Sequence, residues 1–397
     1  MKGKSPFYPG QPVPRESFVG RMSQINRIVE RGLAQASAGK PNTMYVQGEY
    51  GIGKSSIAGF VQWLGERDYG LHGIYAPLGS AETIEDLGAT VLQATLRSGA
   101  LNPNRAERVS SWLAKYVGQQ SFFGVTIHAE ALKKDAPAVA SGMLPFLRET
   151  VDRLKETGVK GLFLVLDEIN GISANPKFAH FIKGLVDTNA LAGEPLPLLL
   201  MLCGVEECRR EMIRYHQPVD RIFDVVEIEP MTPDEMKEFF EKAFESVQMR
   251  VEPDAIALMA EYSAGFPKIM HLVGDAAFWQ DEDGIIDKND AVQAVFVAAD
   301  EVGKKYVDQQ VYKALRSQDY HSILAKIAKM GPDTMSFQRR DVESGLTLSE
   351  RKKFNNFLQK MKTLKVLRSG DMQGEYLFNM RMVRLYIWLQ SLEKPKS

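Results

Sequence analysis

The stretch that most constrains this chain is residues 48–55, which carries the full pattern G-x-x-x-x-G-K-S. It follows a short apolar run at residues 44–46 and precedes a helical pattern. Glycines at these places let the backbone curl so that its N–H groups point at phosphates, and the following helix adds its positive N-terminal end. A glycine-rich turn with a chance lysine is the alternative, but four fixed positions between a strand-like and a helix-like segment favour a phosphate-binding loop. The sequence therefore predicts nucleotide binding.

Within this loop each residue type has a chemical task. Lys54 is placed to reach the outer phosphates, and the Ser55 hydroxyl can ligate Mg²⁺. We therefore expect ATP and Mg²⁺ as cofactors. The predicted nucleotide contacts from the loop and the start of its helix are Gly48, Gly51, Ile52, Gly53, Lys54, Ser55 and Ser56.

A second apolar run, residues 161–166, ends in two carboxylates, Asp167 and Glu168. An unbroken run of this kind is what a buried parallel strand requires. At its carboxyl end Asp167 is placed to hold Mg²⁺, while Glu168 can orient and deprotonate the attacking water. The alternative is an acidic turn after a core strand, which the phosphate loop upstream disfavours. We predict an ATPase with Lys54 and Glu168 as catalytic residues.

Strand-like and helix-like segments alternate through the first 230 residues. Further apolar runs predict strands at 73–78, 197–204 and 225–229, and helical periodicity covers 22–33, 57–64, 84–96, 106–116 and 137–157. Such alternation predicts an α/β fold with a parallel sheet and helices on both faces. We assign residues 1–230 to a P-loop nucleotide-binding core that begins with an extended, proline-rich segment, residues 1–17.

The sequence after this core is helical in its periodicity as far as residue 311. Thr232 followed by Pro233 and two acidic residues is a typical helix start. We expect helices throughout this stretch, which forms a helical lid and connector at residues 231–317.

Residues 318–397 have the pattern of a winged-helix domain. We expect a helix through Ile323 and Ile327, a short helix at 337–342, and a longer helix that starts at the capping box of Thr347 and Glu350. Two short strands, 366–368 and 376–378, would form the wing. Three helices and a β wing make a winged helix, whose third helix enters the major groove of DNA.

Charge is unevenly distributed along the chain. The 397 residues include 49 basic and 50 acidic side chains, but residues 321–397 hold 15 Lys and Arg against 7 Asp and Glu, a net charge of +8. A basic module is the electrostatic footprint of a nucleic-acid binder. The third helix has polar residues opposite its apolar stripe, suited to phosphate contacts and base reading: Lys352, Asn355, Asn356, Gln359 and Lys360. Duplex DNA is the partner we expect, with a solvated helix face or a protein-docking module as the alternative.

The two cysteines, Cys203 and Cys208, are too few for a disulfide framework or a zinc site. We find no export signal and no apolar run long enough for a bilayer, so we expect a cytoplasmic protein without a membrane segment, associated with a prokaryotic nucleoid. Residues 119–130 interrupt the regular alternation. The pair Phe122 and Phe123 could meet a partner there or pack on a neighbouring helix.

Four motifs together resemble the AAA+ ATPases, and among them the origin-recognition-type initiators and related archaeal and bacterial ATPases with a C-terminal winged helix. They are Phe-Val-Gly-Arg at residues 18–21, the phosphate loop, the Asp167-Glu168 pair, and Gly-Phe-Pro-Lys at residues 265–268. The first three are specific as a set. The resemblance covers nearly the whole chain and implies an AAA+ core, a lid and a winged helix.

The resemblance also implies roles for further residues. Phe18 and Val19 would border the adenine. Lys268 stands where the family places an arginine sensor, so it keeps the charge but loses the bidentate fork, and a solvated lysine is the alternative. Cys203 and Gly204 stand where a polar first sensor is usual, which implies slow hydrolysis because a thiol is a weak hydrogen-bonding group.

Family members that assemble supply an arginine to the ATP of the neighbouring subunit. Arg221 is the candidate here, with Arg214 behind it, and a local ion pair of Arg221 with Asp220 or Asp224 is the alternative. Nucleotide-dependent assembly of several copies follows as an expectation.

The function we expect is an ATP switch that turns over slowly and controls DNA binding or assembly on duplex DNA, as in replication initiation, transposition or plasmid maintenance. The choice among these rests on the resemblance. The alternative is a signal-transduction or defence ATPase whose winged helix docks a protein partner. A metabolic kinase is disfavoured, because a lid and a winged helix have no role there.

Overall fold

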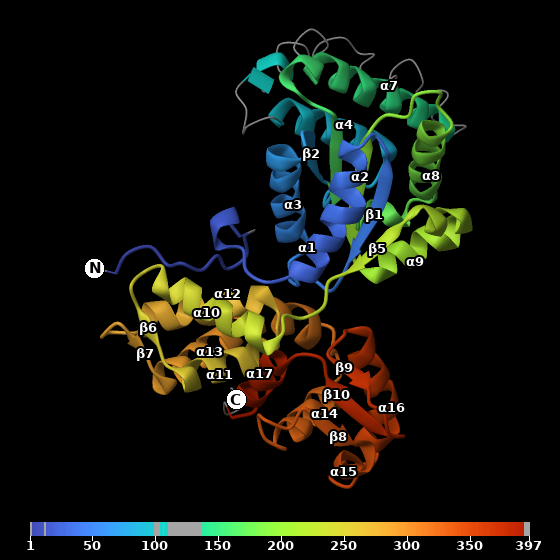
Figure 1. The fold of residues 1–397 in the computed structure, drawn as a ribbon. Helices are drawn as coiled ribbons and strands as arrows, with labels where there is room; N and C mark the ends of the chain where they lie inside the picture. The colour runs from blue at the N-terminus through green and yellow to red at the C-terminus, as the bar shows by residue number, and fades with distance from the viewer. Residues whose placement is uncertain (1, 12, 99–103, 106, 110–135, 393–397) are drawn as a thin grey trace. The chain divides into compact units, whose positions relative to one another are not determined.

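The computed structural model describes residues 2–11, 13–98, 104–105, 107–109 and 136–392 (Figure 1). The chain divides into two compact units. The nucleotide unit is Pro12–Glu229, and the helical unit combines Met1–Gln11 with Pro230–Ser397. The insertion at residues 119–130, with Phe122 and Phe123, and most of the helix expected at 106–116 lie outside the described residues.

The nucleotide unit is built on a five-stranded parallel sheet in the order β2-β3-β4-β1-β5. The strands are β1 (Asn42–Gln47), β2 (Leu71–Pro77), β3 (Gly161–Asp167), β4 (Leu198–Gly204) and β5 (Asp224–Glu227). Every residue of β3 and β4 is buried, so both faces of the sheet are covered there. The predicted parallel sheet is confirmed.

Helices precede β1 and connect successive strands of this sheet (Figure 1). They are α1 (Met22–Ile28), α2 (Ala34–Ser37), α3 (Lys54–Asp68), α4 (Ile84–Arg97), α7 (Ala136–Leu154), α8 (Pro176–Ala190) and α9 (Glu206–Tyr215), and one turn of π-helix, Val29–Leu33, joins α1 to α2. Local sequence fixes their starts. Thr83 and Asp86 form a capping box on α4, and Asn175 caps α8, where Pro176 takes the first helical position.

The helical unit starts with α10 (Pro233–Glu245), whose predicted cap is confirmed as a capping box of Thr232 and Glu235. Next come α11 (Pro253–Ser263), α12 (Pro267–Gln280), α13 (Lys288–Val302) and a π-helical connector, Gly303–Tyr312. The expectation of helix throughout this stretch was wrong in one respect. Two short strands, β6 (Arg250–Val251) and β7 (Ile285–Ile286), pair in parallel. The residues before α11 and those before α13 thereby provide hydrogen-bond partners for each other's backbone N–H and C=O groups.

The N-terminal segment packs on the helical unit through Phe7. Its ring lies 5.1 Å from that of Phe244 and 5.9 Å from that of Phe239, between centroids. A Cβ at position 274 would fall 2.2 Å from the Phe7 ring, so Gly274 makes room for it. Burying one phenylalanine contributes about 1.5–3 kcal/mol toward holding this segment on the helical unit.

The rest of the helical unit is α14 (Gln318–Ala328), β8 (Ser336–Gln338), α15 (Arg339–Glu343), α16 (Leu348–Thr363), β9 (Leu367–Ser369), β10 (Glu375–Phe378) and α17 (Arg381–Leu392). The helix expected at 337–342 was wrong at its start, since residues 336–338 form β8 and only 339–343 are helical. β8 pairs with β10, and the Phe337 ring stacks on that of Tyr376 at 5.8 Å. This cross-strand pairing outweighs local helix propensity.

The last helix, α17, joins this part of the chain to the connector. The Tyr386 ring occupies the space where a side chain at Gly303 would be, and its hydroxyl donates to Asp308 Oδ1 at 2.9 Å. Arg384 is fully buried and donates to the carbonyl oxygens at the end of α14, including that of Ala328 at 3.1 Å. Burial lowers the pKa of Arg384 to about 10, so its guanidinium stays charged at neutral pH. Among the described residues, no helix has the length and apolar character needed to cross a membrane.

Candidate nucleotide site and basic face

The phosphate loop lies between β1 and α3, at the carboxyl end of the sheet. Gly51 and Gly53 have φ values of 77° and 102°, in the left-handed region that favours glycine. Gly48 is required for a different reason, since a Cβ there would lie 2.8 Å from the backbone oxygen of Ile228. The backbone shape that turns N–H groups toward a phosphate therefore depends on glycine at three predicted positions. Ile52 is buried beneath the loop, and Ser55 and Ser56 belong to the first turn of α3.

Lys54 is the first residue of α3, and its side chain lies over the loop. The ammonium donates to the backbone oxygens of Gly48 at 2.8 Å and Glu49 at 2.9 Å. Burial lowers the pKa of Lys54, while the nearby Cys203 and Asp167 act in the opposite direction. A cation held here by weak acceptors can move to phosphate oxygens, which bind it more strongly because they are charged.

The two side chains expected to hold Mg²⁺ are joined by Tyr75, which the sequence did not single out. The Tyr75 hydroxyl donates to Asp167 Oδ2 and also hydrogen-bonds with the Ser55 side chain. Asp167 is 3% exposed at the end of β3. A hydroxyl and a carboxylate at one place fit the hard oxygen ligands that Mg²⁺ takes from protein, with phosphate and water oxygens completing the shell. Burial and the neighbouring Asp167 raise the pKa of Tyr75, so its hydroxyl remains a donor.

Glu168 follows β3 in a left-handed conformation, with φ at 56°. Its backbone N–H donates to Asp167 Oδ1 at 2.9 Å, which holds the turn. The carboxylate lies over the turn after β2, because a Cβ at Gly79 would be 2.5 Å from Glu168 Oε2. A non-glycine residue in this region is uncommon and costs free energy, and such conformations gather at functional sites. The carboxylate is exposed and can reach a water molecule.

Cys203 is fully buried near the end of β4, and Gly204 follows it. Burial raises the pKa of the Cys203 thiol, and the charge of Asp167 adds to this shift. The thiol is therefore neutral and a weak donor. A buried neutral thiol is poorly suited to position a water molecule. This agrees with the expectation of slow hydrolysis, which rests on Cys203 standing where a polar first sensor is usual.

Phe18 and Val19 lie half-buried beside α3. The Phe18 ring stacks on Phe60 with centroids 4.6 Å apart and the planes 14° apart. The backbone N–H of Val13 donates to the Ser56 hydroxyl at 3.5 Å, so the segment runs along the first turns of α3. This arrangement brings Phe18 and Val19 to the helix that carries the phosphate loop.

Arg21 connects the phosphate loop to the end of the nucleotide unit. It is 4% exposed, and its guanidinium donates to the backbone oxygen of Ile52 at 3.1 Å and to that of Glu229. Ile52 belongs to the loop, and Glu229 is the last residue of the unit. Hydrogen bonds from a charged donor are stronger than neutral ones, so these two bonds couple the position of the loop to that of Glu229. The motif that contains Arg21 was recognised from the sequence, but this link was not.

Arg221 is exposed at the end of a 3-10 helix, Gln217–Ile222. The acidic neighbours suggested for a local pair bind other arginines. Asp220 pairs with Arg209 at 2.6 Å, and Asp224 pairs with Arg27 at 2.5 Å. Lys268, in the first turn of α12, is also exposed and belongs to the helical unit. Their assigned roles remain predictions.

A family model described as Novel STAND NTPase 1 matches residues 8–375 of the chain. The chain belongs to this family. Its fold is also that of two solved structures. The Walker-type ATPase of Pyrococcus abyssi has a TM-score of 0.55 and 17% identity, with 94% of this chain and 97% of that chain covered. The ORC2 protein of Aeropyrum pernix, in ADPNP and ADP complexes, has a TM-score of 0.58 and 12% identity, with 97% and 95% covered. A comparison with curated proteins gave no match.

The STAND NTPase family and the Walker-type neighbour support the expected enzyme class, and the chain is an ATPase. The initiator branch suggested by the sequence is represented among the structural neighbours, while the family itself is that of the STAND NTPases. The resemblance was therefore right about the P-loop ATPase core, and the C-terminal winged helix stays a prediction.

The second site predicted from the sequence lies on α16 of this NTPase. The apolar stripe is buried as expected, at Phe354, Phe357, Leu358 and Met361. On the remaining surface of the helix, four predicted DNA-binding side chains are exposed and the fifth is half-buried: Lys352, Asn355, Asn356, Gln359 and Lys360. The capping box of Thr347 and Glu350 is confirmed, and Glu350 also pairs with Lys326 at 2.6 Å. The helix thus presents a polar, basic face to solvent.

Proposed function

We propose that this NTPase is an ATP-controlled switch whose output is duplex DNA binding by the basic face of α16. The observation that carries the proposal is the joint presence of two sites in one chain. One is a complete phosphate loop beside Asp167 and Glu168, and the other is an exposed basic helix face in a segment with a net charge of +8. A switch needs an input site and an output surface, and these two meet that need.

In the nucleotide site we assign the phosphates to the loop and Lys54, and the adenine to the border formed by Phe18 and Val19. Ser55 and Asp167 would hold Mg²⁺, which supplies charge neutralisation of the phosphates. Glu168 would accept the proton of the attacking water. Lys268 would sense the outer phosphate, and Arg221 of an adjacent copy would complete the site in an assembled state.

Arg21 supports the idea that occupancy of the loop affects more than the loop. Its guanidinium is bonded both to Ile52 of the loop and to Glu229, after which the chain enters the helical unit. A shift of the loop backbone on phosphate binding would alter one of these bonds. A ligand shifts a conformational equilibrium only if it makes different contacts in the two conformations. The bonds of Arg21 are a physical means by which phosphate binding would favour one conformation over the other.

The helical unit would bind DNA as a winged helix, with α16 in the major groove and the β9–β10 hairpin as the wing. Its element order, α14-β8-α15-α16-β9-β10, supports this proposal. The subdivision at residue 317 into lid and winged-helix domain is part of the same proposal. Cytoplasmic, nucleoid-associated localisation would follow from it.

Charge reversal on α16 tests the DNA proposal. The variant K352E/K360E should bind duplex DNA at least tenfold more weakly at 150 mM salt, because each cation lost from a phosphate contact costs affinity and lowers the salt dependence. Binding is measured by fluorescence anisotropy of labelled duplex at several salt concentrations. The control K237E/K242E reverses two exposed lysines of α10, which pair with Glu241 and Glu238. Equal loss in both variants, or none in the first, would reject α16 as the DNA face.

The family description favours a second function, that of a signal-transduction or defence ATPase. This is the alternative that the sequence analysis raised. In that case the same basic face would dock an acidic protein partner. The full-length protein then shows no salt-sensitive binding of duplex DNA. An acidic protein partner binds instead, and its binding depends on ATP. The anisotropy titration above distinguishes the two.

A further inference from the structure

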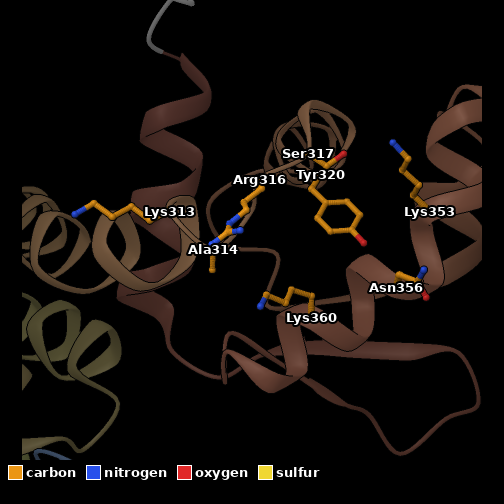
Figure 2. A pocket seen from close by; sticks show the side chains of 8 residues that line it. All are labelled: Lys313, Ala314, Arg316, Ser317, Tyr320, Lys353, Asn356 and Lys360. Carbon is orange, nitrogen blue, oxygen red and sulfur yellow. The ribbon is translucent and has the colours of Figure 1, made fainter.

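A cleft of about 640 Å³ lies in the helical unit where three segments meet. One wall is the segment between the connector and α14, from Lys313 to Ser317. Tyr320 of α14 lies in the middle of the lining residues in Figure 2, and α16 forms the other wall. The α16 wall consists of Lys353, Asn356 and Lys360.

Cations surround this cleft, and no acidic residue lines it. Figure 2 shows Tyr320 between Arg316 on one side and Lys353 with Asn356 on the other, while the side chain of Lys313 extends away from the group. Arg316 is exposed and Lys360 half-buried. Within the described residues neither side chain has a recorded ion pair or hydrogen bond. Two cations are thus available to an anionic ligand.

The third cation, Lys353, is only partly neutralised. It pairs with Asp319 Oδ2 at 2.7 Å, and the Ser349 hydroxyl donates to the same oxygen at 2.9 Å. The hydrogen bonds from Lys353 and Ser349 lower the pKa of Asp319, which keeps this carboxylate charged and Lys353 oriented. Three cations face one neighbouring carboxylate, so the cleft carries excess positive charge. The hydroxyls of Ser317 and Tyr320 and the amide of Asn356 add donors of the kind that bind phosphate oxygens.

We propose that this cleft binds phosphate groups of the DNA backbone, beside the face of α16 that reads the duplex. This inference rests on the proposed DNA binding and adds a positioning site to it. Asn356 and Lys360 belong to both surfaces, so a strand lying on α16 continues into the cleft. Backbone contacts of this kind fix the register of a protein on DNA without reading its sequence. A free polyphosphate offers the same chemistry and is the competing source.

The test changes Arg316 and Lys353, two cations of the cleft that are not among the predicted DNA-binding residues of α16. The full-length variant R316Q/K353Q removes two positive charges and keeps side-chain size. Each phosphate contact contributes about 0.9 to the slope of log Kobs against log salt, so the slope should become less steep by about 1.8 with duplex DNA. Preference between two duplex sequences should stay unchanged. The control K237Q/K242Q removes the same charge from α10 and should leave the slope as in the unaltered protein.

Two other results would overturn the inference. A duplex salt slope equal to that of the unaltered protein rejects the cleft and leaves DNA binding by α16 intact. Absence of salt-sensitive duplex binding in the unaltered protein rejects both. To identify a free ligand, inorganic tripolyphosphate is titrated into K54A and K54A/R316Q/K353Q, in which the phosphate loop no longer competes. Tight binding that is lost in the second protein, together with an unchanged duplex slope, would assign the cleft to a free polyphosphate instead.

Discussion

Glu168 and Tyr75 flank the same buried carboxylate, Asp167, but the residues have different chemistry. Glu168 is exposed and held in a left-handed turn, as a base that must meet water requires. Tyr75 is a donor that orients Asp167 and Ser55. Substitution of each residue therefore separates the chemical step from the assembly of the site.

The variant E168Q should bind ATP with unchanged affinity and hydrolyse it about 10²–10⁴-fold more slowly, because the amide cannot accept a proton from water. Single-turnover hydrolysis and ATP binding by calorimetry measure the two effects. E85Q, at an exposed position in the first turn of α4, is the control and should turn over normally. Full activity in E168Q would mean that another group activates the water.

The variant Y75F should require roughly tenfold more Mg²⁺ for half-maximal ATPase activity, because outer-shell partners of metal ligands contribute about that much to affinity. Y45F is a matched control. Tyr45 is buried in the same sheet, but its hydroxyl donates to the Val205 backbone oxygen at 3.0 Å. Both variants lose a hydrogen bond of the tyrosine hydroxyl, which costs stability of about 1 kcal/mol, yet only Y75F should shift the Mg²⁺ titration. The same shift in both would show that the effect is structural.

At the scale of elements, β2 carries a buried histidine that makes the nucleotide unit sensitive to acid. His72 Nε2 lies 2.7 Å from the Ser98 hydroxyl, and burial lowers the His72 pKa to about 4, with Arg105 adding to the shift. The unfolded chain takes up this proton near pH 6.5. The histidine therefore contributes stability that is present above pH 6.5 and is lost as the pH falls toward 4.

Between pH 7 and pH 5 this linkage should lower the free energy of unfolding by about 2 kcal/mol. The variant H72Q should be less stable at pH 7 but should lose about 2 kcal/mol less over the same interval. Urea unfolding at the two pH values measures the difference. H180Q, which changes an exposed histidine on α8, should keep the full pH dependence. An unaltered pH dependence in H72Q would exclude His72 as its source. His271 in the helical unit, whose pKa burial also lowers to about 4, accounts for any remaining dependence.

Elements with strong local signals could be predicted from the sequence, and those formed by distant pairing could not. Contiguous apolar residues are enough to predict the buried strands β3 and β4. A threonine followed three residues later by a glutamate is enough to predict the starts of α10 and α16. β8 has three residues and forms only because β10 pairs with it, so periodicity around Phe337 suggested a helix. The last helix, α17, was not assigned a place, because its packing on the connector depends on Tyr386 and Arg384 contacts far away in sequence.

The candidate site shows the same division. The loop, Asp167 and Glu168 are recognisable because they lie in contiguous motifs. Tyr75 sits on a neighbouring strand, and only the register of β2 against β3 brings it to Asp167. Arg21 belongs to a motif, but its bond to Glu229 joins positions 208 residues apart. Side chains that support a site from another strand carry no local signal.

At the scale of the whole molecule, the chain passes between its two units twice, after Gln11 and after Glu229. Phe7 holds the N-terminal segment to the helical unit, and Arg21 bonds to Glu229 beside the second passage. The polypeptide chain thus links the nucleotide unit to the unit that contains α16 at two places. The central claim of the proposed function is that a nucleotide which changes the loop acts through these two links on duplex binding by the helical unit.

The most direct test is duplex DNA binding by the full-length protein with ATP, with ADP and without nucleotide, at one salt concentration, read together with its mass in solution. K54A, which lacks the lysine of the phosphate loop, is the control in which nucleotide should have no effect. We predict that duplex affinity differs at least fivefold between ATP and ADP, which corresponds to about 1 kcal/mol of coupling, with a larger assembly in ATP. Equal affinity and equal mass in all three states would contradict the account.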